Sequence, residues 1–239
     1  MSNRQGALVL FTLSPRADGK RKSLAPEVVA ALISRVQSVS SAVEGVDLLV
    51  ATPSQAPKGV SPGRHLRQRG RDFGESLRLA VEDAFDLGYR PVVVVGNDAP
   101  EISASYLTRA FEALASGVTK AVLGPASDGG YNLLGLSRPC AGVFDSIPWG
   151  SSRVCDLTES RLHREGFEVL RLETVSDVDD VRDLERLLHR LRRRVDPALR
   201  SLGRELRDLT RAVPAWVEGA VLSPVPAPAR IGLLRAPPT

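Results

Sequence analysis

The sequence has few of the residue types that mark disulfide-rich, metal-binding and membrane proteins. Only two of its 239 residues are cysteines, Cys140 and Cys155, and they show neither metal-ligand spacing nor a disulfide framework. The three histidines, His65, His163 and His189, have no paired ligand spacing either. No apolar run approaches the roughly 20 residues needed to span a bilayer. We therefore interpret both cysteines as buried thiols and expect no membrane-spanning segment.

The chain also lacks a targeting segment and is poor in aromatic residues. Its start, MSNRQGALVLFT, goes directly into a strand-like run without a signal-peptide cleavage region, so we expect a cytoplasmic protein. Aromatic residues make up 5% of the chain, which argues against a base-stacking surface for nucleic acid. What remains is an ordinary soluble composition, 43% hydrophobic and 25% charged, and long enough for one large domain or one domain with appendages.

The chain carries a net charge of +4, and much of the excess lies in two segments. One is the run Lys20-Arg21-Lys22 together with residues 64–71, and the other is the helix-like segment 189–211. A basic loop that faces the phosphates of a small molecule explains the first segment as well as a nucleic acid would. A nucleic-acid binder that uses residues 189–211 stays open as a weaker alternative.

Strand-like and helix-like segments alternate along the chain. Strands are expected at residues 7–12, 46–52, 91–96, 120–125, 131–136 and 167–174, and helices at 25–39, 73–88, 103–117, 152–166 and 179–194. The run PVVVVG has no polar alternation, which indicates a strand covered on both faces. The alternation predicts an α/β fold, a three-layer sandwich with a mostly parallel central sheet and helices on both faces.

The alternating pattern ends near residue 195, and no internal repeat is visible. We expect one domain over residues 1–195, followed by a C-terminal helix and a proline-rich extension over residues 196–239. From Pro214 onward the proline content rules out a continuous helix. The sequence leaves open whether the chain forms a homodimer.

A carboxylate stands at the tip of the most hydrophobic strand, in the stretch VVVVGNDAP from Val92 to Pro100. In doubly wound sheets, ligands bind beyond the carboxyl ends of the strands, and Gly96 allows close approach of the backbone there. Asp98 is thus placed to hold a hard cation such as Mg²⁺, which would bridge to phosphate oxygens. Capping of the next helix is the alternative, although Ser103 is nearer to the start of that helix.

Two further segments place carboxylates between predicted elements. GPASDGGYNLLGL carries Asp128 and two glycines between two apolar strands, and a hairpin turn is its simplest interpretation. In ETVSDVDDVRDLERL, the residues Asp177, Asp179 and Asp180 follow a strand and precede a helix. One of them suffices as an N-cap, and three crowded carboxylates repel one another unless a cation lies among them.

In combination these segments resemble the nucleotide-diphospho-sugar transferase superfamily, which has a GT-A-type fold. More closely they resemble the bacterial DUF2064 family, also labelled rSAM/selenodomain-associated transferase 1. The matching pieces cover about residues 6–190 in the family's order: ALVLFTLSPRADGK, QRGRDFGESLRLAVEDAFDLGYRPVVVVGNDAP, GPASDGGYNLLGL, IPWGSSRV and DVDDVRDLERL. The resemblance implies a nucleotide site on the N-terminal half of the sheet and an acceptor site on the other half.

The resemblance also implies a metal site built from distant parts of the chain. Asp98 matches the metal-binding Asp of the family's Gly-x-Asp-x-Pro motif, while Asp177 and Asp179 match its Asp-x-Asp-Thr pattern before the last helix. These residues would hold Mg²⁺, or Mn²⁺, which neutralises a diphosphate and stabilises charge on a leaving diphosphate. Asp98 thereby takes a catalytic role, and most of the catalysis would be positioning and electrostatics.

Relatives in this family cradle the nucleotide phosphates with a loop after the first strand, which usually reads Gly-Lys-x-Lys-Thr-Arg-Leu. This chain reads Gly-Lys-Arg-Lys-Ser-Leu-Ala-Pro there, so the span is one residue shorter and Arg21 is the nearest substitute for the usual arginine. A Gln-x-Gly position before the central helix matches as well. The residues that the resemblance assigns to the nucleotide are Lys20, Arg21, Lys22, Gln68, Gly70 and Asn97.

The acceptor side is assigned from the second motif and from PWGSSRV. Asp128 would orient or deprotonate an acceptor hydroxyl as a general base, with a plain turn role as the alternative. The tryptophan of PWGSSRV either packs or forms part of a lid. The residues assigned to the acceptor are Gly129, Gly130, Tyr131, Trp149 and Arg153.

We therefore expect a Mg²⁺-dependent transferase that takes a nucleotide-sugar or a nucleoside triphosphate and a small-molecule acceptor. The family label favours glycosyl transfer. The kin of the family, which include 2-phospho-lactate guanylyltransferases and molybdenum cofactor nucleotidyltransferases, favour nucleotidyl transfer to a phosphorylated small molecule. A catalytically weakened binding or scaffold protein is the remaining alternative, because the phosphate loop departs from the family pattern.

Overall fold

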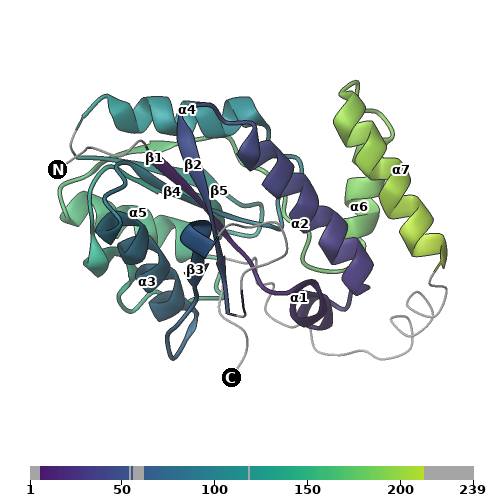
Figure 1. Ribbon diagram of the computed structural model, residues 1–239, viewed down its shortest axis with the longest axis horizontal. Coiled ribbons are helices and arrows are strands. Elements are labelled where there is room, and N and C mark those ends of the chain that lie inside the picture. Colours follow the sequence, from purple (N-terminus) through teal and green to yellow (C-terminus); the bar gives the residue numbers. More distant parts are fainter. Residues whose placement is uncertain (1–5, 54, 56–61, 118, 213–239) are drawn as a thin grey trace.

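Seven strands form one sheet in the computed structural model, which describes residues 6–53, 55, 62–117 and 119–212 (Figure 1). The strands are β1 (Gly6–Phe11), β2 (Val46–Thr52), β3 (His65–Arg67), β4 (Val92–Gly96), β5 (Lys120–Pro125), β6 (Tyr131–Leu136) and β7 (Glu168–Arg171). Their order is β3-β2-β1-β4-β6-β5-β7; β6 runs antiparallel to both of its neighbours, and the other pairs are parallel. The predicted α/β sandwich with a mostly parallel sheet is confirmed.

The centre of the sheet is the pair formed by β1 and β4. Val9 of β1 lies opposite Val94 of β4, and both side chains are 0% exposed. A strand that is covered on both faces loses the usual alternation of apolar and polar residues, which explains the unbroken valine run. That run ends at Gly96, so Asn97 and Asp98 follow at the carboxyl edge of the sheet.

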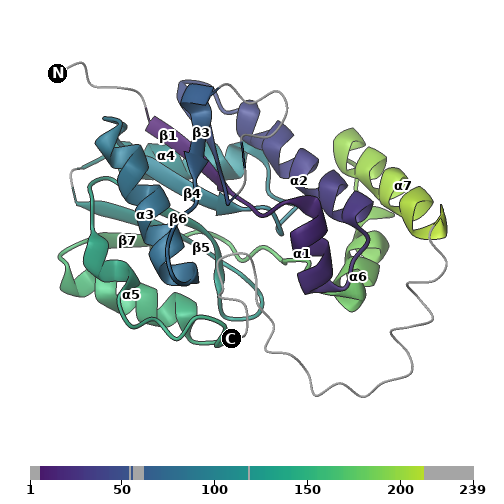
Figure 2. The ribbon, with the colours of Figure 1, turned by 60° about the horizontal axis from the view of Figure 1, so that its bottom comes forward.

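Helices cover both faces of the sheet, as Figure 1 and Figure 2 show. α3 (Phe73–Asp86) and α5 (Val154–Arg164) pack on one face, whereas α2 (Pro26–Ser41) and α4 (Ala104–Ala115) pack on the other. In α3 the apolar residues recur at helical spacing, so one side of the helix is buried against the sheet and the other stays polar. The three layers place the ends of all the parallel strands at one accessible edge.

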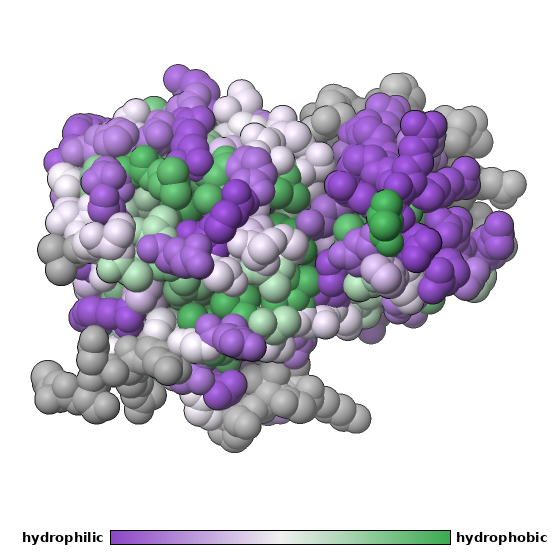
Figure 3. Space-filling model, turned by 90° about the horizontal axis from the view of Figure 1, so that it is seen from above, coloured by the Kyte–Doolittle hydropathy of each residue, from purple (hydrophilic) through white to green (hydrophobic). Residues whose placement is uncertain are grey.

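A further apolar cluster joins the C-terminal helices to the N-terminal half of the chain. α6 (Val181–Leu191) and α7 (Pro197–Ala212) pack against each other and against α2. Leucines at helical spacing form this contact, namely Leu184, Leu187 and Leu191 of α6 with Leu199, Leu202 and Leu206 of α7. The other sides of these helices carry charged residues, and this end of the molecule is predominantly hydrophilic in the view of Figure 3.

The domain boundary predicted at residue 195 falls between α6 and α7, and it stays a prediction. α7 packs on α2 and α6 across this boundary. The proline-rich segment from Pro214 onward lies outside the described residues. Within the part of the chain that the structure describes, no helix is both long and apolar enough to cross a membrane.

The segment after β1 forms a helix, α1 (Pro15–Lys22), where the sequence predicts a basic loop. Ser14 caps its start by accepting a hydrogen bond from the backbone N–H of Ala17, and Ser23 ends it in the left-handed conformation with φ 56°. The three basic residues occupy its last turn, where they favour the helix dipole. Apolar periodicity does not reveal this helix because it has almost no apolar residues. Strand β3 was not predicted either, because three residues are too few to show a strand periodicity.

Candidate functional site

Aspartates from separate parts of the chain gather at the carboxyl edge of the sheet. One follows β4, one lies between β5 and β6, two follow β7, and one comes from α1 after β1. These five are Asp18, Asp98, Asp128, Asp177 and Asp179. The loops are tied together through the backbone, because the N–H of Val178 donates to the carbonyl of Asp98 at 2.8 Å. Parallel strands end at the same edge, so residues far apart in the sequence become neighbours there.

One half of this cluster is built around a buried lysine. The Lys22 side chain is 0% exposed, and its Nζ donates to the carbonyl oxygen of Val178 at 2.6 Å. The same Nζ lies 3.2 Å from Asp98 Oδ2 and 3.9 Å from Asp179 Oδ1. A buried ammonium is tolerated only when it is paired and hydrogen-bonded, and these partners meet that need. Lys22 therefore joins the loops after β1, β4 and β7.

Arg21 and Asp18 complete this half. The Arg21 guanidinium donates from Nε and Nη2 to Asp18 Oδ1 at 3.0 and 2.8 Å, and Asn97 Nδ2 donates to Asp18 Oδ2 at 3.1 Å. Burial raises the pKa of Asp18, but Lys22 and Arg21 outweigh it and hold that pKa below its ordinary value. Sequence analysis did not single out Asp18. Its spacing of three and four residues from Arg21 and Lys22 on one helix was the available signal.

The other half of the cluster is an acid triad, defined as Asp128, Asp177 and Asp179. One carboxylate oxygen from each lies within 4.8 Å of the others. Asp177 Oδ2 and Asp179 Oδ1 are buried, and neither has a hydrogen-bond partner among the described residues. Asp177 Oδ1 accepts a hydrogen bond from Ser127 Oγ at 3.3 Å. Buried carboxylate oxygens left in this state carry a large desolvation cost, so the triad is arranged for a ligand rather than for stability.

The pKa values of two acid-triad carboxyl groups show that their ionised form is unfavourable in this site. Burial, together with the repulsion of the neighbouring charges of Asp179 and Asp128, raises the pKa of Asp177 to about 8. Burial also raises the pKa of Asp179 to about 7, with Lys22 acting in the opposite direction and Asp98 adding repulsion. Protons or a cation must therefore offset the charge at neutral pH.

The acid triad fits a divalent ion by its ligand chemistry and by its unsatisfied oxygens. Carboxylate oxygens are the donors that Mg²⁺ and Mn²⁺ prefer, and three of them converge here. Asp177 and Asp179 were predicted as ligands from the resemblance. Asp98 was predicted as a third, but in the structure Asp128 completes the triad and Asp98 pairs with Lys22.

A cavity of about 320 Å³ opens beside the acid triad. Loop residues Ser127 and Ser176 line it together with the triad, and α6 contributes Asp183, Arg186 and Arg190. Neither arginine was singled out from the sequence. A basic residue on a surface helix gives no indication of which loop residues will lie next to it in the folded chain.

The residues predicted to bind a nucleotide occupy different environments. Lys20 is exposed, whereas Lys22 and Asn97 are fully enclosed by the contacts described above. Gln68 Nε2 donates to the carbonyls of Thr12 and Ala51 at 3.0 and 2.8 Å, so Gln68 is anchored to the residue after β1 and to strand β2. Gly70 has φ 140°, a conformation that favours glycine. The nucleotide roles of these residues stay predictions.

The residues predicted for the acceptor lie beyond Asp128. Gly130 donates its N–H to Asp128 Oδ1 at 2.7 Å, so Asp128 also organises the turn. Gly129 has φ 91°, and a Cβ there would lie 2.0 Å from the carbonyl oxygen of Ser152, so glycine is required for this close approach. Tyr131 is 3% exposed, and Arg153 is exposed at the start of α5.

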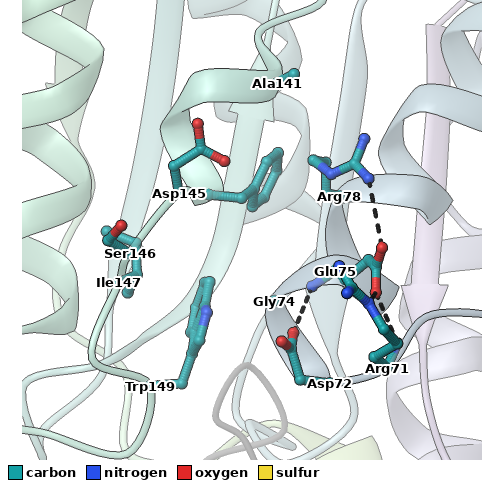
Figure 4. Close-up of a pocket in the computed structure, with 11 residues that line it drawn as sticks. Arg71, Asp72, Gly74, Glu75, Arg78, Ala141, Asp145, Ser146, Ile147 and Trp149 are labelled. Atoms are coloured by element: carbon teal, nitrogen blue, oxygen red, sulfur yellow. Dashed lines mark hydrogen bonds and ion pairs between the residues drawn. The ribbon is translucent and has the colours of Figure 1, made fainter.

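Trp149 lines a second and larger cavity of about 460 Å³ (Figure 4). Figure 4 shows Arg78, Glu75 and Arg71 of the α3 side opposite Asp145 and Trp149 of the loop before α5. Trp149 also stacks edge-on against Phe73 and lies 6.3 Å from the Tyr131 ring. This cavity contains none of the acid triad, so its size alone does not make it the centre of the chemistry. We place the candidate site at the smaller cavity because the unsatisfied carboxylates line it.

Known proteins with similar sequences or structures have the same α/β fold as this chain. Residues 40–151 match the family model described as an uncharacterized protein conserved in bacteria, DUF2064. A structure from Desulfovibrio desulfuricans G20, proposed to be a nucleotide-diphospho-sugar transferase, is 26% identical, with a TM-score of 0.71 over 92% of this chain and 98% of that one. Comparison with proteins of curated function finds no match.

Two more distant structures share the fold. CMP:2-keto-3-deoxy-manno-octonic acid synthetase, complexed with CTP, is 12% identical with a TM-score of 0.51, and covers 76% of this chain and 96% of that one. A nucleotidyl transferase from Methanothermobacter thermautotroptrophicus is 19% identical with a TM-score of 0.50, and covers 80% and 99%. The resemblance found in the sequence is thus confirmed: residues 40–151 match the DUF2064 family model, and the chain has the nucleotide-diphospho-sugar transferase fold.

Proposed function

We propose that this protein is a Mg²⁺-dependent transferase that takes a nucleotide-sugar donor and a small-molecule acceptor. The observation that carries this proposal is the acid triad: three carboxylates converge within 4.8 Å at the carboxyl edge of the sheet, and two of them bear buried oxygens that have no hydrogen-bond partner among the described residues. A structure with the same fold binds a nucleotide. Carboxylates at such a site commonly bind the divalent ion that accompanies the phosphates of the nucleotide.

Asp128, Asp177 and Asp179 are the residues that would hold the ion, which could be Mg²⁺ or Mn²⁺. When bound, the ion supplies charge neutralisation for the diphosphate of the donor. Lys22 acts on the protein itself: it holds Asp98 and Asp179 at their positions through its Nζ contacts. Lys20, which is exposed, would meet the phosphates, and Arg21, 15% exposed and paired with Asp18, lies beside it in the last turn of α1.

The side chain of Asp128 is the best placed to act on the acceptor. Its Oδ1 is oriented by the N–H of Gly130 at 2.7 Å, which fixes the direction of the carboxylate. In the transfer, the acceptor hydroxyl would lose its proton to this carboxylate while its oxygen forms a bond to the anomeric carbon of the donor sugar, and the bond from that carbon to the nucleoside diphosphate, which leaves, would break. Positioning of the two substrates would supply most of the remaining rate enhancement.

Two donor chemistries fit the site, and one is favoured. The Desulfovibrio structure is the more similar of the three compared, and it is proposed to be a nucleotide-diphospho-sugar transferase. This favours a nucleotide-sugar donor over a nucleoside triphosphate. Nucleotidyl transfer to a phosphorylated acceptor is the second candidate, in line with the shared fold of the nucleotidyl transferase compared above.

A paired assay tests the proposal. Purified protein with MgCl₂ or MnCl₂ is incubated with a panel of nucleotide-sugars and, separately, of nucleoside triphosphates, and release of nucleoside diphosphate or pyrophosphate is followed. Asp177→Asn is expected to lose metal-dependent turnover, while Asp208→Asn on the exposed side of α7 is the matched control and retains it.

The alternative functions make different predictions in the same experiment. Pyrophosphate release without sugar-donor turnover would assign nucleotidyl transfer. If no nucleotide raises the melting temperature with either metal and no donor turns over, the transferase proposal is wrong and a binding or scaffold role replaces it.

A further inference from the structure

The cavity beside the acid triad has a basic wall as well as an acidic one. Arg186 and Arg190 lie four residues apart on α6, so they present side chains on the same side of that helix. Both line the cavity that Asp128, Asp177 and Asp179 line from the opposite loops. Guanidinium groups bind phosphate and carboxylate groups through charge-assisted hydrogen bonds. An oxyanion in this cavity would contact both the arginines and the candidate cation.

Arg190 is held in place and keeps donor capacity. Its Nε donates to Glu101 Oε2 at 2.6 Å, and Glu101, which is only 7% exposed, also accepts from Arg194 at 2.7 Å. The Nη2 atom of Arg190 is buried and has no hydrogen-bond partner among the described residues. A buried N–H group without a partner is unfavourable, more so when it is charged, and a ligand oxygen would relieve that cost.

Arg186 is linked to the acid triad through one intermediate. Its Nη2 pairs with Asp183 Oδ1, and the other oxygen of Asp183 accepts the backbone N–H of Asp179 at 3.2 Å. The Arg186 side chain is 51% exposed, so its remaining N–H groups are accessible from the cavity. The loop that carries Asp177 and Asp179 and the helix that carries the arginines are therefore fixed relative to each other.

We propose that Arg186 and Arg190 form an oxyanion subsite that binds a phosphate or carboxylate group of the acceptor. The role of this group as part of the acceptor rests on the proposed function. The subsite lies on α6, beside the loops after β5 and β7, whereas the exposed Lys20 lies on α1, after β1. The acceptor of this enzyme is thus an anionic small molecule rather than a neutral one.

The charges of the cavity also set an order of binding. Without a divalent ion the acid triad repels an anion, and with the ion bound the repulsion becomes attraction. The structure therefore assigns the oxyanion to the metal-loaded protein, and linkage requires that the anion tighten metal binding by the same factor. Inorganic phosphate and acetate, as the simplest members of the two anion classes, are suitable probes.

Phosphorus NMR with Mn²⁺ tests this inference on the full-length protein. Mn²⁺ binding is first measured by electron paramagnetic resonance, and the relaxation of the ³¹P nucleus of inorganic phosphate is then followed. Phosphate beside the bound Mn²⁺ is expected to relax strongly in the wild type. In Arg186→Gln/Arg190→Gln the phosphate affinity is expected to fall at least tenfold, while Mn²⁺ affinity measured without phosphate stays within about threefold. Acetate, tested by displacement of phosphate, reports whether a carboxylate is accepted too.

The matched control is Arg204→Gln, an exposed arginine on α7, which is expected to bind phosphate as the wild type does. Equal phosphate binding in the wild type and the double variant overturns the subsite. If nucleoside diphosphates displace the phosphate, the subsite binds the donor and not the acceptor, and its assignment to the acceptor is overturned. If the double variant does not fold, Arg186→Gln alone is used, since this side chain is half exposed. A phosphate affinity equal to that of the wild type then also overturns the subsite.

Failure of the proposed function is distinguishable from failure of this inference. If Mn²⁺ does not bind at all, the proposed function loses its ion. Calorimetry with phosphate alone then decides the subsite, since a wild-type affinity that the double variant loses supports it and equal or absent binding in both overturns it.

Discussion

The ammonium of Lys22 lies 3.2 Å from Oδ2 of Asp98, and both side chains are almost fully buried. Asp98, at the end of the central strand, thus has a cation from its own chain as a partner. This pairing divides the five aspartates into a half neutralised by Lys22 and Arg21 and a half, the acid triad, whose charge is offset only in part. Asp179 belongs to both halves, since its Oδ1 lies 3.9 Å from Lys22 Nζ.

Substitution of this lysine is expected to be strongly destabilising. Lys22→Met keeps an unbranched apolar stem but removes the ammonium 3.2 Å from the buried carboxylate of Asp98, while Asp18 keeps its pairing with Arg21. Removing one partner of a buried ion pair costs about 3–5 kcal/mol. Urea unfolding followed by circular dichroism at pH 7 measures the loss. Lys20→Met, on the exposed side of the same helix, is the control and is expected to change stability by less than about 0.5 kcal/mol. A similar small change for Lys22→Met would contradict the buried pairing.

The stability of the metal-free protein is expected to fall as the pH rises from 5 to 9. The pKa of Asp177 is raised to about 8 and that of Asp179 to about 7, from an ordinary value of 3.8. The folded state therefore binds protons that the unfolded state has lost. The contribution of these groups to stability is fully present below the ordinary pKa and is lost as the pH rises through 7 to 8. The slope is expected to be about 1.4 kcal/mol per pH unit for each proton that the folded state alone binds.

Melting temperatures in EDTA across this pH range test the prediction. Saturating MgCl₂ is expected to flatten the dependence, because the ion replaces the protons. A melting temperature that is constant or rises from pH 5 to 9 in EDTA would show that the two carboxyls are ionised throughout.

Asp177→Asn is expected to separate stability from metal binding. The amide removes one charge from the crowded acid triad, so the metal-free variant is expected to melt higher than the wild type at pH 8. The same change removes a metal ligand, and Mn²⁺ affinity is expected to fall at least a hundredfold by electron paramagnetic resonance titration. Asp208→Asn serves as the matched control. Unchanged Mn²⁺ affinity in Asp177→Asn would place the ion elsewhere.

Gly74→Ala is expected to move Trp149 and reshape the larger cavity. A Cβ at residue 74 would lie 2.2 Å from Nε1 of the Trp149 indole. Alanine is the better helix former, but overpacking costs about 1–3 kcal/mol and outweighs that gain. Tryptophan fluorescence in a Trp216→Phe background and urea unfolding measure the two effects. Gly63→Ala, whose Cβ meets no atom of the described residues within 4 Å, is the control. An unchanged emission spectrum and stability in Gly74→Ala would contradict the contact.

Much of the fold follows from local patterns. The run Val92–Val95 and the amphipathic segments on either side of it were sufficient to predict a buried strand between helices, because burial on two faces or on one imposes different periodicities. The positions of Asp98, Asp177 and Asp179 just after strands were enough to predict that they share an edge of the sheet. The sequence could therefore locate the candidate site, and the motifs in combination indicated its family.

The pairing of charges within the site was decided by tertiary structure alone. Lys22 stands in a basic run that a sequence presents as solvated, yet it is buried and donates to Val178, 156 residues further along the chain. Arg186 and Arg190 belong to a helix whose polar side has no local reason to face a carboxylate. Whether a charged side chain is exposed, paired or left for a ligand depends on what the rest of the chain brings within a few ångströms of it. Strand and helix periodicity carries no information about that distance, and only the folded arrangement supplies it.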